Sequence, residues 1–385
     1  MGELGEIMTG STPSTSKSEY YSEDGIPWVT PTDINSQTIS DTPRKLSGEG
    51  IKVGRVVPAN TILCTCIASI GKNTLLTVKG SFNQQINCLT PNEYNDAYFL
   101  LTESEIWSNI MKRMAAAGTM QIVNKTEFSE LTTMVPKLEE QKKIGQYFHT
   151  IGHLITLHQR KYDKLQIIKK AMLEKMFPQN GSCFPEIRFK GFTDSWEQRK
   201  FDKWGDFYYG HSCPKWSVTE DATIPCIRYG ELYTKFGAKI DKVYSYTNMP
   251  TEKLRFSKGT EVLIPRVGED PMDYNHCTWL SLKDVAIGEM ISVFNTDQDP
   301  LFSATMFNAT LQKEFAIRVE GGSVTNLYFD KLRNIDISYP LLAEQKKIAA
   351  FFENLDHLIT LHQRMQKNSK QYIITMKSIL NNIKY

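Results

Sequence analysis

The octapeptide HLITLHQR occurs at residues 153–160 and again at residues 357–364, 204 positions later. The similarity extends on both sides: residues 136–160 and 340–364 align without a gap and are identical at 16 of 25 positions. Self-similarity of this kind means that the chain carries two copies of one unit. A length of 385 residues, too long for one ordinary core, agrees with a duplicated chain of more than one domain.

The repeated segment has the pattern of a long helix. Apolar residues recur at alternating steps of four and three, which is the seam of a coiled coil. Each copy follows a proline, and the first ends near Met176, just before Pro178. A helix from Glu140 to Met176 has 37 residues and a length of about 55 Å. The seam positions are Ile144, Phe148, Ile151, Ile155, His158, Tyr162 and Leu165 in the first copy and Ile348, Phe352, Leu355, Ile359 and His362 in the second.

A weaker echo of the repeat continues outside the helices. Gly5 and Gly10 match Gly205 and Gly210, and the dipeptide at 26–27 matches the one at 224–225, although the rest has diverged. We therefore predict an α+β protein with a pseudo-twofold internal duplication, in which a pair of long antiparallel coiled-coil helices separates two mixed domains. The predicted segments are block 1 (1–137), a long helix (138–178), a linker (179–200), block 2 (201–341) and a second long helix (342–385).

This pattern of constant helices and variable blocks predicts that the helices and the blocks bind different partners. Two nearly identical helices suit one partner that is met twice, while two unlike blocks suit two different ligands. A simpler alternative stays open, in which an old duplication kept its helices similar only for packing. His158 and His362 fall on the seam in both copies, where a polar residue typically fixes the register of paired helices.

Composition limits the classes of function. The formal net charge is only +2, so a nucleic-acid partner would have to meet a local basic surface. The seven cysteines form no CxxC pair, which disfavours a disulfide scaffold or structural zinc and favours a reducing compartment. The sequence has no secretory leader and no apolar run of membrane-spanning length. We expect a cytoplasmic protein that makes no contact with membranes.

Catalytic motifs are missing from the sequence. It contains no GxGxxG or GxxxxGK[ST] phosphate loop, no GxSxG elbow and no acidic-Pro-Pro-aromatic tetrapeptide of an amino-methyltransferase. The HTIGH stretch at 149–153 lacks the glutamate of a zincin, and His149 is replaced by Glu353 in the second copy. We expect neither a metal site nor a catalytic residue in this chain.

Basic, amide and aromatic side chains are candidates for binding DNA. Arginine and lysine contact phosphates or guanine edges, whereas asparagine, glutamine and serine contact adenine and sugar-phosphate groups. For each candidate, a solvated charge or a half-buried aromatic is the open alternative. The candidates are Ser11, Thr12, Lys72, Gln84 and Gln85 in block 1, and Tyr208, Lys215, Arg228, Tyr229, Lys235 and Arg266 in block 2.

A set of ordered motifs resembles one known family. PxLxEQKKI begins each helix, and KKAMLEKMFPQNGSCFPEIRFKGFTDSWEQRK follows at 169–200. Block 1 has GSTPS at 10–14, GIPW at 25–28 and FNQQI at 82–86. Block 2 has IPCIRYGELYTKFG at 224–237, VLIPRVGE at 262–269 and GGSVTNLYFDKL at 321–332. Over essentially its whole length, the chain resembles the specificity (S) subunit of Type I restriction-modification enzymes.

The resemblance implies a DNA-recognition subunit without an active site. Each block would be a target-recognition domain that reads one half of a split DNA sequence. The two helices would set the distance between half-sites and dock two methyltransferase (M) subunits. The M subunits would methylate adenine with S-adenosylmethionine, and restriction (R) subunits would cleave DNA with ATP and Mg. The candidates for helix pairing and docking are Gln141, Ile144, Phe148, Ile151, Ile155, His158, Gln345, Ile348, Phe352, Leu355, Ile359 and His362.

Two departures from the family pattern stand out. The segment at 184–200 has no counterpart before block 1, because Met1 aligns with about Phe201, whereas members of the family often carry such a segment at the front. Block 2 lacks the NQQ element, so no base contact is carried over to it from block 1. The leading alternative function is a duplicated coiled-coil adaptor whose blocks bind proteins, followed by a self-contained methyltransferase or nuclease.

Overall fold

The chain divides into two compact units. The structure, a computed structural model, describes residues 1–117, 122–179 and 181–383. One unit comprises Met1–Arg160 with Gln363–Tyr385, and the other comprises Lys161–His362. Each unit therefore contains one block and a part of each long helix. The finer division into five segments stays a prediction.

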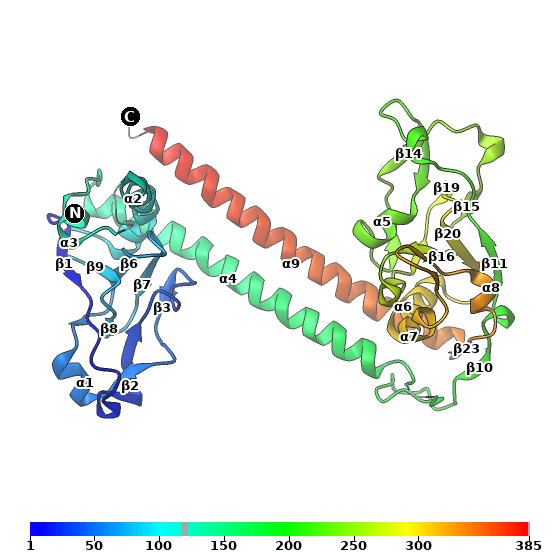
Figure 1. Ribbon diagram of the computed structural model, residues 1–385, viewed down its shortest axis with the longest axis horizontal. Helices are drawn as coiled ribbons and strands as arrows, with labels where there is room; N and C mark the ends of the chain where they lie inside the picture. The colour runs from blue at the N-terminus through cyan, green and yellow to red at the C-terminus, as the bar shows by residue number, and fades with distance from the viewer. Residues whose placement is uncertain (118–121, 180, 384–385) are drawn as a thin grey trace. The chain divides into compact units, whose positions relative to one another are not determined.

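Block 1 is built on two β-sheets (Figure 1). Its strands are Gly5–Thr9 (β1), Tyr21–Val29 (β2), Thr38–Ile39 (β3), Lys45–Leu46 (β4), Val56–Val57 (β5), Thr61–Thr65 (β6), Asn73–Leu76 (β7), Gly80–Phe82 (β8) and Ile86–Pro91 (β9). The five-stranded sheet has the order β1-β9-β6-β7-β3, and only its β7–β3 pair is parallel. The four-stranded sheet has the order β4-β2-β8-β5, and only its β2–β8 pair is parallel.

Block 2 repeats both sheets strand for strand. Its corresponding strands are Asp206–Tyr209 (β11), Ile224–Ile227 (β12), Lys239–Ile240 (β13), Ser245–Thr247 (β14), Phe256–Lys258 (β15), Glu261–Pro265 (β16), Thr278–Leu280 (β18), Lys283–Ile287 (β19) and Ile291–Asn295 (β20). The sheet orders are β11-β20-β16-β18-β13 and β14-β12-β19-β15, again with one parallel pair each, β18–β13 and β12–β19. The predicted α+β class and internal duplication are confirmed, and the duplication includes the diverged block interiors.

The central strands explain how the diverged sequences keep one fold. All five residues of β6 and all five of β16 are buried. In β6, Ile62 faces a core that includes Trp107 of helix α2 (Ala97–Ala117), while Leu63 faces the core of the other sheet. In β16, Val262 faces the core of helix α6 (Pro300–Thr310) and Leu263 the opposite one. The period of two between the faces is kept although the residues differ.

A buried glutamine joins each long helix to its block. Gln141 lies in the first turn of α4 (Leu138–Lys175) and Gln345 in the first turn of α9 (Leu342–Ile383). The Gln141 amide donates to the Pro136 carbonyl at 2.8 Å and accepts from the Asp96 backbone N–H at 2.9 Å. Gln345 makes the same two bonds, to Pro340 at 2.8 Å and from Asp299 at 3.0 Å.

Both aspartates in turn start the neighbouring helix of the block. The Asp96 carboxylate accepts from the backbone N–H of Phe99 in α2, and that of Asp299 accepts from Phe302 in α6, each at 2.8 Å. The glutamine of the EQKK motif is thus part of the junction between block and long helix.

Within each unit, the two long helices contact each other and run in opposite directions (Figure 1). In the first unit, Tyr147 of α4 bonds to Tyr372 of α9 at 2.7 Å, and further along α4 the Gln159 amide contacts that of Gln366. In the second unit, Lys169 pairs with Asp356 at 2.5 Å, and Phe177, just after α4, stacks on Phe352 at 5.8 Å. Partner numbers fall along α9 as they rise along α4, so the pairing is antiparallel, as predicted.

Block 2 carries short strands in addition to the duplicated sheets. One pair joins β10 of the linker (Glu197–Lys200) to β23 (Asp336–Tyr339). A three-stranded sheet within block 2 consists of Val267–Gly268 (β17), Thr325–Asn326 (β22) and Glu320–Gly321 (β21). The remaining helices are Gly48–Val53 (α1), Lys125–Glu130 (α3), Tyr229–Thr234 (α5), Gln312–Ala316 (α7) and Phe329–Leu332 (α8). Short 3-10 turns lie at Ser18–Tyr20, Phe201–Lys203, Lys215–Ser217, Thr251–Lys253 and Pro271–Asp273.

The linker is fixed to the start of α9 by a buried ion pair. Arg188 Nε and Nη2 each donate to a different carboxylate oxygen of Glu344 at 2.7 Å. The Glu344 side chain is fully buried. Glu140, the matching residue of the first helix, is exposed.

Candidate nucleic-acid interface

Loops of block 1 meet at one end of its sheets. They follow β1 (residues 10–14) and β2 (30–33) and connect β8 to β9 (83–85). The backbone N–H of Ser11 donates to Phe82 O at 2.9 Å, and that of Asn83 donates to Val29 O at 3.0 Å. The β6–β7 loop (66–72) joins them, since Cys66 N donates to Gln85 O at 2.8 Å. We call these four segments the loop end of block 1.

Block 2 has the same loop end with different residues. Its segments 210–215, 228–231 and 288–290, the second of which includes the first residues of α5, correspond to 10–14, 30–33 and 83–85. His211 N donates to Ile287 O at 2.7 Å, and Gly288 N donates to Ile227 O at 3.0 Å. Arg266 N donates to Met290 O at 3.3 Å, which repeats the bond from Cys66. The backbone frame is therefore common to both blocks, while its side chains differ.

Two glycines make this frame possible. A Cβ atom on Gly10 would lie 2.1 Å from Asn83 O, and one on Gly210 would lie 2.1 Å from Gly288 O. No side chain fits at these distances, because the two backbones press against each other. The close approach explains why glycine recurs at both positions in sequences that otherwise differ.

The structure brings all five block 1 candidates to the loop end. Thr12 and Gln84 are exposed and contact each other through Thr12 Oγ1 and Gln84 Oε1. Ser11 and Gln85 are half-buried, and Ser11 Oγ accepts from the Arg55 backbone N–H at 2.8 Å. Lys72 is exposed in the β6–β7 loop. Hydroxyl, amide and ammonium groups thus gather on one surface.

The block 2 candidates are only partly brought together. Lys215, Arg228 and Tyr229 line one pocket of about 220 Å³, together with the exposed Glu289. Tyr208 lies in β11, outside this pocket. Lys235 follows α5, and its ammonium group lies 5.8 Å from the centre of the Tyr244 ring. These last two candidates therefore belong to other surfaces.

Arg266 is held at the loop end between aromatic rings. Its guanidinium lies 4.6 Å from the ring centre of Tyr209 and 5.1 Å from that of Tyr328. Burial raises the pKa of the neighbouring Tyr208 to about 12, and burial also raises the pKa of Tyr209. Both phenols therefore stay protonated at neutral pH.

Sequence reasoning missed an exposed arginine beside each loop end. Arg55 Nη1 donates to the carbonyl of Thr9, the last residue of β1. Arg255 Nη1 donates to the carbonyl of Tyr209, the last residue of β11, at 2.7 Å. The signal was present, because the two arginines are 200 residues apart, as Gly10 and Gly210 are.

The helix candidates fall into two groups. The buried candidates are Gln141, Phe148, Gln345, Ile348, Phe352, Leu355 and Ile359. The half-buried candidates are Ile144, Ile151, Ile155, His158 and His362. Ile348 and Phe352 belong to the core of block 2, and Ile144 packs against that of block 1. The start of each seam therefore binds the helix to its own block.

The repeated octapeptide also leaves apolar side chains in solvent. Leu154 and Leu157 of α4 are 41% and 38% exposed, and their counterparts Leu358 and Leu361 of α9 are 42% and 40% exposed. These four residues, here called the repeated leucines, were absent from the predicted docking set. The exposed fractions of these leucines are similar in the two copies, although helix formation does not require leucine at an exposed position.

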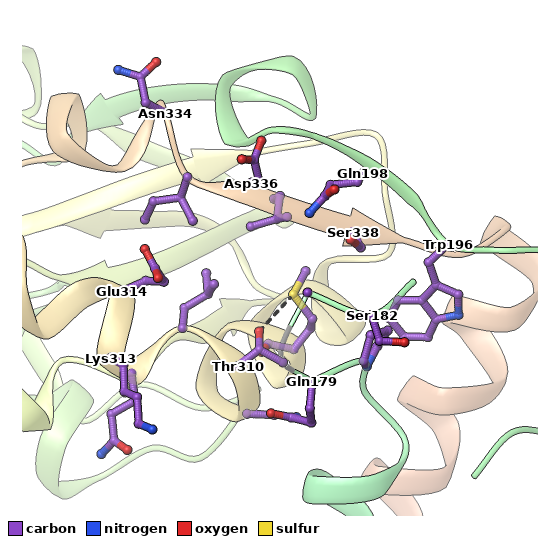
Figure 2. Close-up of a pocket in the computed structure, with 18 of the residues that line it drawn as sticks. Gln179, Ser182, Trp196, Gln198, Thr310, Lys313, Glu314, Asn334, Asp336 and Ser338 are labelled. Atoms are coloured by element: carbon purple, nitrogen blue, oxygen red, sulfur yellow. Dashed lines mark hydrogen bonds between the residues drawn. The ribbon is translucent and has the colours of Figure 1, made fainter. Parts of the chain in front are cut away.

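A separate pocket lies where the linker meets block 2 (Figure 2). It has a volume of about 500 Å³ and is lined by linker residues such as Gln179 and Trp196 and by Thr310 and Asp336 of the block. Its lining residues do not include those of the loop end, among the residues that the structure describes. This pocket is therefore formed by the packing of the linker on block 2 and is not a part of the candidate interface.

The fold and the loop ends define an internally duplicated protein that presents two unlike polar surfaces on one backbone frame. Residues 1–166 and 284–370 match the family described as the Type I restriction modification DNA specificity domain. These ranges cover more than half of the chain, which therefore belongs to this family.

Individual relatives agree with the family. The chain is 23% identical to the specificity subunit of the Type I restriction enzyme MjaIX of Methanocaldococcus jannaschii, over 97% of this chain and 88% of that protein. It is 30% identical to the HindI specificity subunit of Haemophilus influenzae, over 38% of this chain and 34% of that protein. The fold is similar to the crystal structure of the Type I S subunit from M. genitalium, with a TM-score of 0.62, 12% identity and coverage of 97% and 93%.

No helix in residues 1–117, 122–179 and 181–383 combines sufficient length with sufficient apolarity to cross a bilayer.

Proposed function

We propose that each block reads one half of a bipartite DNA sequence within a Type I restriction-modification complex. The observation that carries the proposal is the common frame with exchanged side chains. Gln84 of block 1 corresponds to Glu289 of block 2, and Thr30 corresponds to Arg228. An amide suits adenine, a carboxylate accepts from cytosine N4, and arginine suits guanine. Equivalent positions with different hydrogen-bonding groups are what two different half-sites require.

The long helices serve two roles in this proposal. As helices of 38 and 42 residues, α4 and α9 are about 57 and 63 Å long, enough to hold half-sites at a set separation. Their repeated octapeptides provide two equivalent surfaces for two M subunits. We place the docking contacts at the repeated leucines, because these are exposed and identical in both copies, whereas every residue of the predicted seam is buried or half-buried.

We further propose that the chain itself catalyses no step and acts in the cytoplasm. The M subunits would transfer the methyl group to adenine from S-adenosylmethionine, and the R subunits would cleave DNA with ATP and Mg. Support comes from the sequence, which has neither a phosphate loop nor an amino-methyltransferase tetrapeptide. The small net charge of +2 fits a chain that relies on its partners for further phosphate contacts.

The proposal is tested by mapping DNA methylation. The chain and its M subunit are expressed together in a host without other adenine methyltransferases, and the methylated sites are sequenced. We expect one split, asymmetric motif that requires both proteins. Methylation of the same sites by the M subunit alone, or retention of random and target duplexes alike in a gel shift, would instead favour the adaptor.

A further inference from the structure

We infer that Arg55 and Arg255 are an equivalent pair of phosphate contacts, one beside each loop end. The inference rests on the proposed function, since it assigns a role within DNA binding. It names two residues whose chemistry is the same in both blocks, in contrast to the loop side chains, which differ.

The two arginines make the same hydrogen bond at corresponding places in the two blocks. Arg55 precedes the edge strand β5, and Arg255 precedes the corresponding edge strand β15. Each guanidinium donates to the carbonyl of the residue directly before Gly10 or Gly210. Both side chains are exposed. The arginines therefore lie next to the point where the first loop leaves the sheet.

Most of the donor capacity of each guanidinium stays available. A guanidinium carries five N–H donors. In both arginines, Nη1 donates to the carbonyl of the last strand residue before the glycine. Among the described residues, neither arginine has a carboxylate oxygen within 4.0 Å. Arg188, by comparison, uses two nitrogens on Glu344. Neither arginine is thus neutralised; one hydrogen bond positions each, and the Arg255 guanidinium also lies 5.0 Å from the centre of the Tyr208 ring.

Packing alone does not explain why arginine stands at both places. A hydrogen bond between exposed groups contributes little to stability, because water replaces it. The glycines of the loop end recur because the backbone leaves no room, but an exposed position imposes no such limit. Since the block sequences have otherwise diverged, a shared exposed arginine points to a shared ligand.

The shared ligand is the DNA backbone rather than a base. If the two blocks read different half-sites, a residue common to both must contact what the half-sites have in common. Phosphates carry no sequence information, and contacts to them fix the register of a protein on the duplex. The anchored, planar guanidinium suits a phosphate with two parallel hydrogen bonds.

The test measures DNA binding by the complex of the chain with its M subunits. Arg55→Ala and Arg255→Ala are compared with Lys79→Ala and Arg199→Ala, which remove exposed charges away from the loop ends. Affinity for the mapped target and for a scrambled duplex is measured across salt concentrations. We expect each arginine variant to bind both duplexes about tenfold more weakly, with a salt slope smaller by about one. The controls should keep the wild-type slope.

Two further measurements separate the possible outcomes. Arg55→Lys and Arg255→Lys keep the charge and should retain most of the slope, even if an alanine variant unfolds. Wild-type affinity and slope in the alanine variants, or a changed methylation motif, would overturn the inference. If the wild-type complex itself shows no preference for the mapped target, the proposed function fails instead, so the two failures are distinguishable.

Discussion

Gln84 and Glu289 occupy the same place on the loop between the last strands of the two sheets. Each side chain is exposed. The carbonyl of the residue that follows accepts a hydrogen bond from a backbone N–H of the adjacent loop, that of Cys66 in block 1 and that of Arg266 in block 2. The backbone thus holds the loop tip, and the exposed side chain is accessible to a ligand, although that of Gln84 also contacts Thr12. This separation of roles makes Gln84 a suitable position for testing base recognition.

Replacing Gln84 with alanine should relax the DNA motif at one position in one half-site. The lost amide removes a donor and an acceptor, which corresponds to about 1–3 kcal/mol of discrimination between bases. Sequencing of methylated sites measures the change. Glu93→Ala is the control, since Glu93 is exposed just after the far end of β9. An unaltered motif in the Gln84 variant would remove this residue from the reading surface.

Gln141→Ala and Gln345→Ala should each destabilise the junction between a block and its long helix. Each substitution leaves a backbone N–H and a carbonyl without their bonds in a buried site, at a cost of roughly 1–3 kcal/mol. Thermal unfolding should show a lower Tm. Gln146→Ala, at an exposed position of the same helix, should leave the Tm unchanged. Equal Tm values for Gln141→Ala and Gln146→Ala would contradict the role assigned to the buried amide.

Single residues show both what the sequence could predict and what it could not. The five block 1 candidates were predicted from residue type and from the motifs GSTPS and FNQQI, and the structure places them at one loop end. Gln141 and Gln345 were read as docking residues, since a helical period does not distinguish a face turned toward a partner from one turned toward its own block. Arg55 and Arg255 were missed because one matched arginine pair, although it keeps the spacing of Gly10 and Gly210, does not stand out in a diverged region before the strands are aligned.

The elements of the fold were predicted unevenly for a physical reason. The first long helix, expected at 140–176, spans Leu138–Lys175, because its apolar period and flanking prolines are local signals. The matching sheets of the two blocks were not predicted. Their central strands, β6 and β16, are short and buried on both faces, so any apolar side chain of suitable volume satisfies them. A common topology therefore persists after the sequence similarity has gone.

The repeated leucines give a prediction for the helices as elements. Leu154→Gln with Leu157→Gln should remove one of two bound M subunits, and Leu358→Gln with Leu361→Gln should remove the other. Stability should change little, since surface substitutions usually alter it by less than about 0.5 kcal/mol. Native mass spectrometry counts the M subunits on each variant. Ile167→Gln, at a position that is 69% exposed but outside the repeat, is the control. Retention of two M subunits by all variants would place docking elsewhere.

For the whole molecule, the duplication explains how unlike half-sites are read by one chain. The frame of each loop end depends on backbone bonds and on one glycine, so the side chains that it presents can change without loss of fold. The junction between block and helix depends on a glutamine, an aspartate and a proline carbonyl in each copy. A block should therefore be exchangeable as a unit when these junction groups are kept.

Exchange of residues 1–136 for those of a related S subunit should change one half of the methylated motif and leave the other half and the spacing intact. The spacing is kept because α4 and α9 are untouched, and the second half is kept because block 2 is untouched. The donor block must supply a proline carbonyl and an aspartate N–H for Gln141, or the junction will loosen. Sequencing of methylated sites gives the new motif, and the Tm of the hybrid shows whether the junction has formed. A hybrid of normal Tm with the original motif would mean that block 1 does not read DNA, and one with altered spacing would mean that the helices alone do not set it.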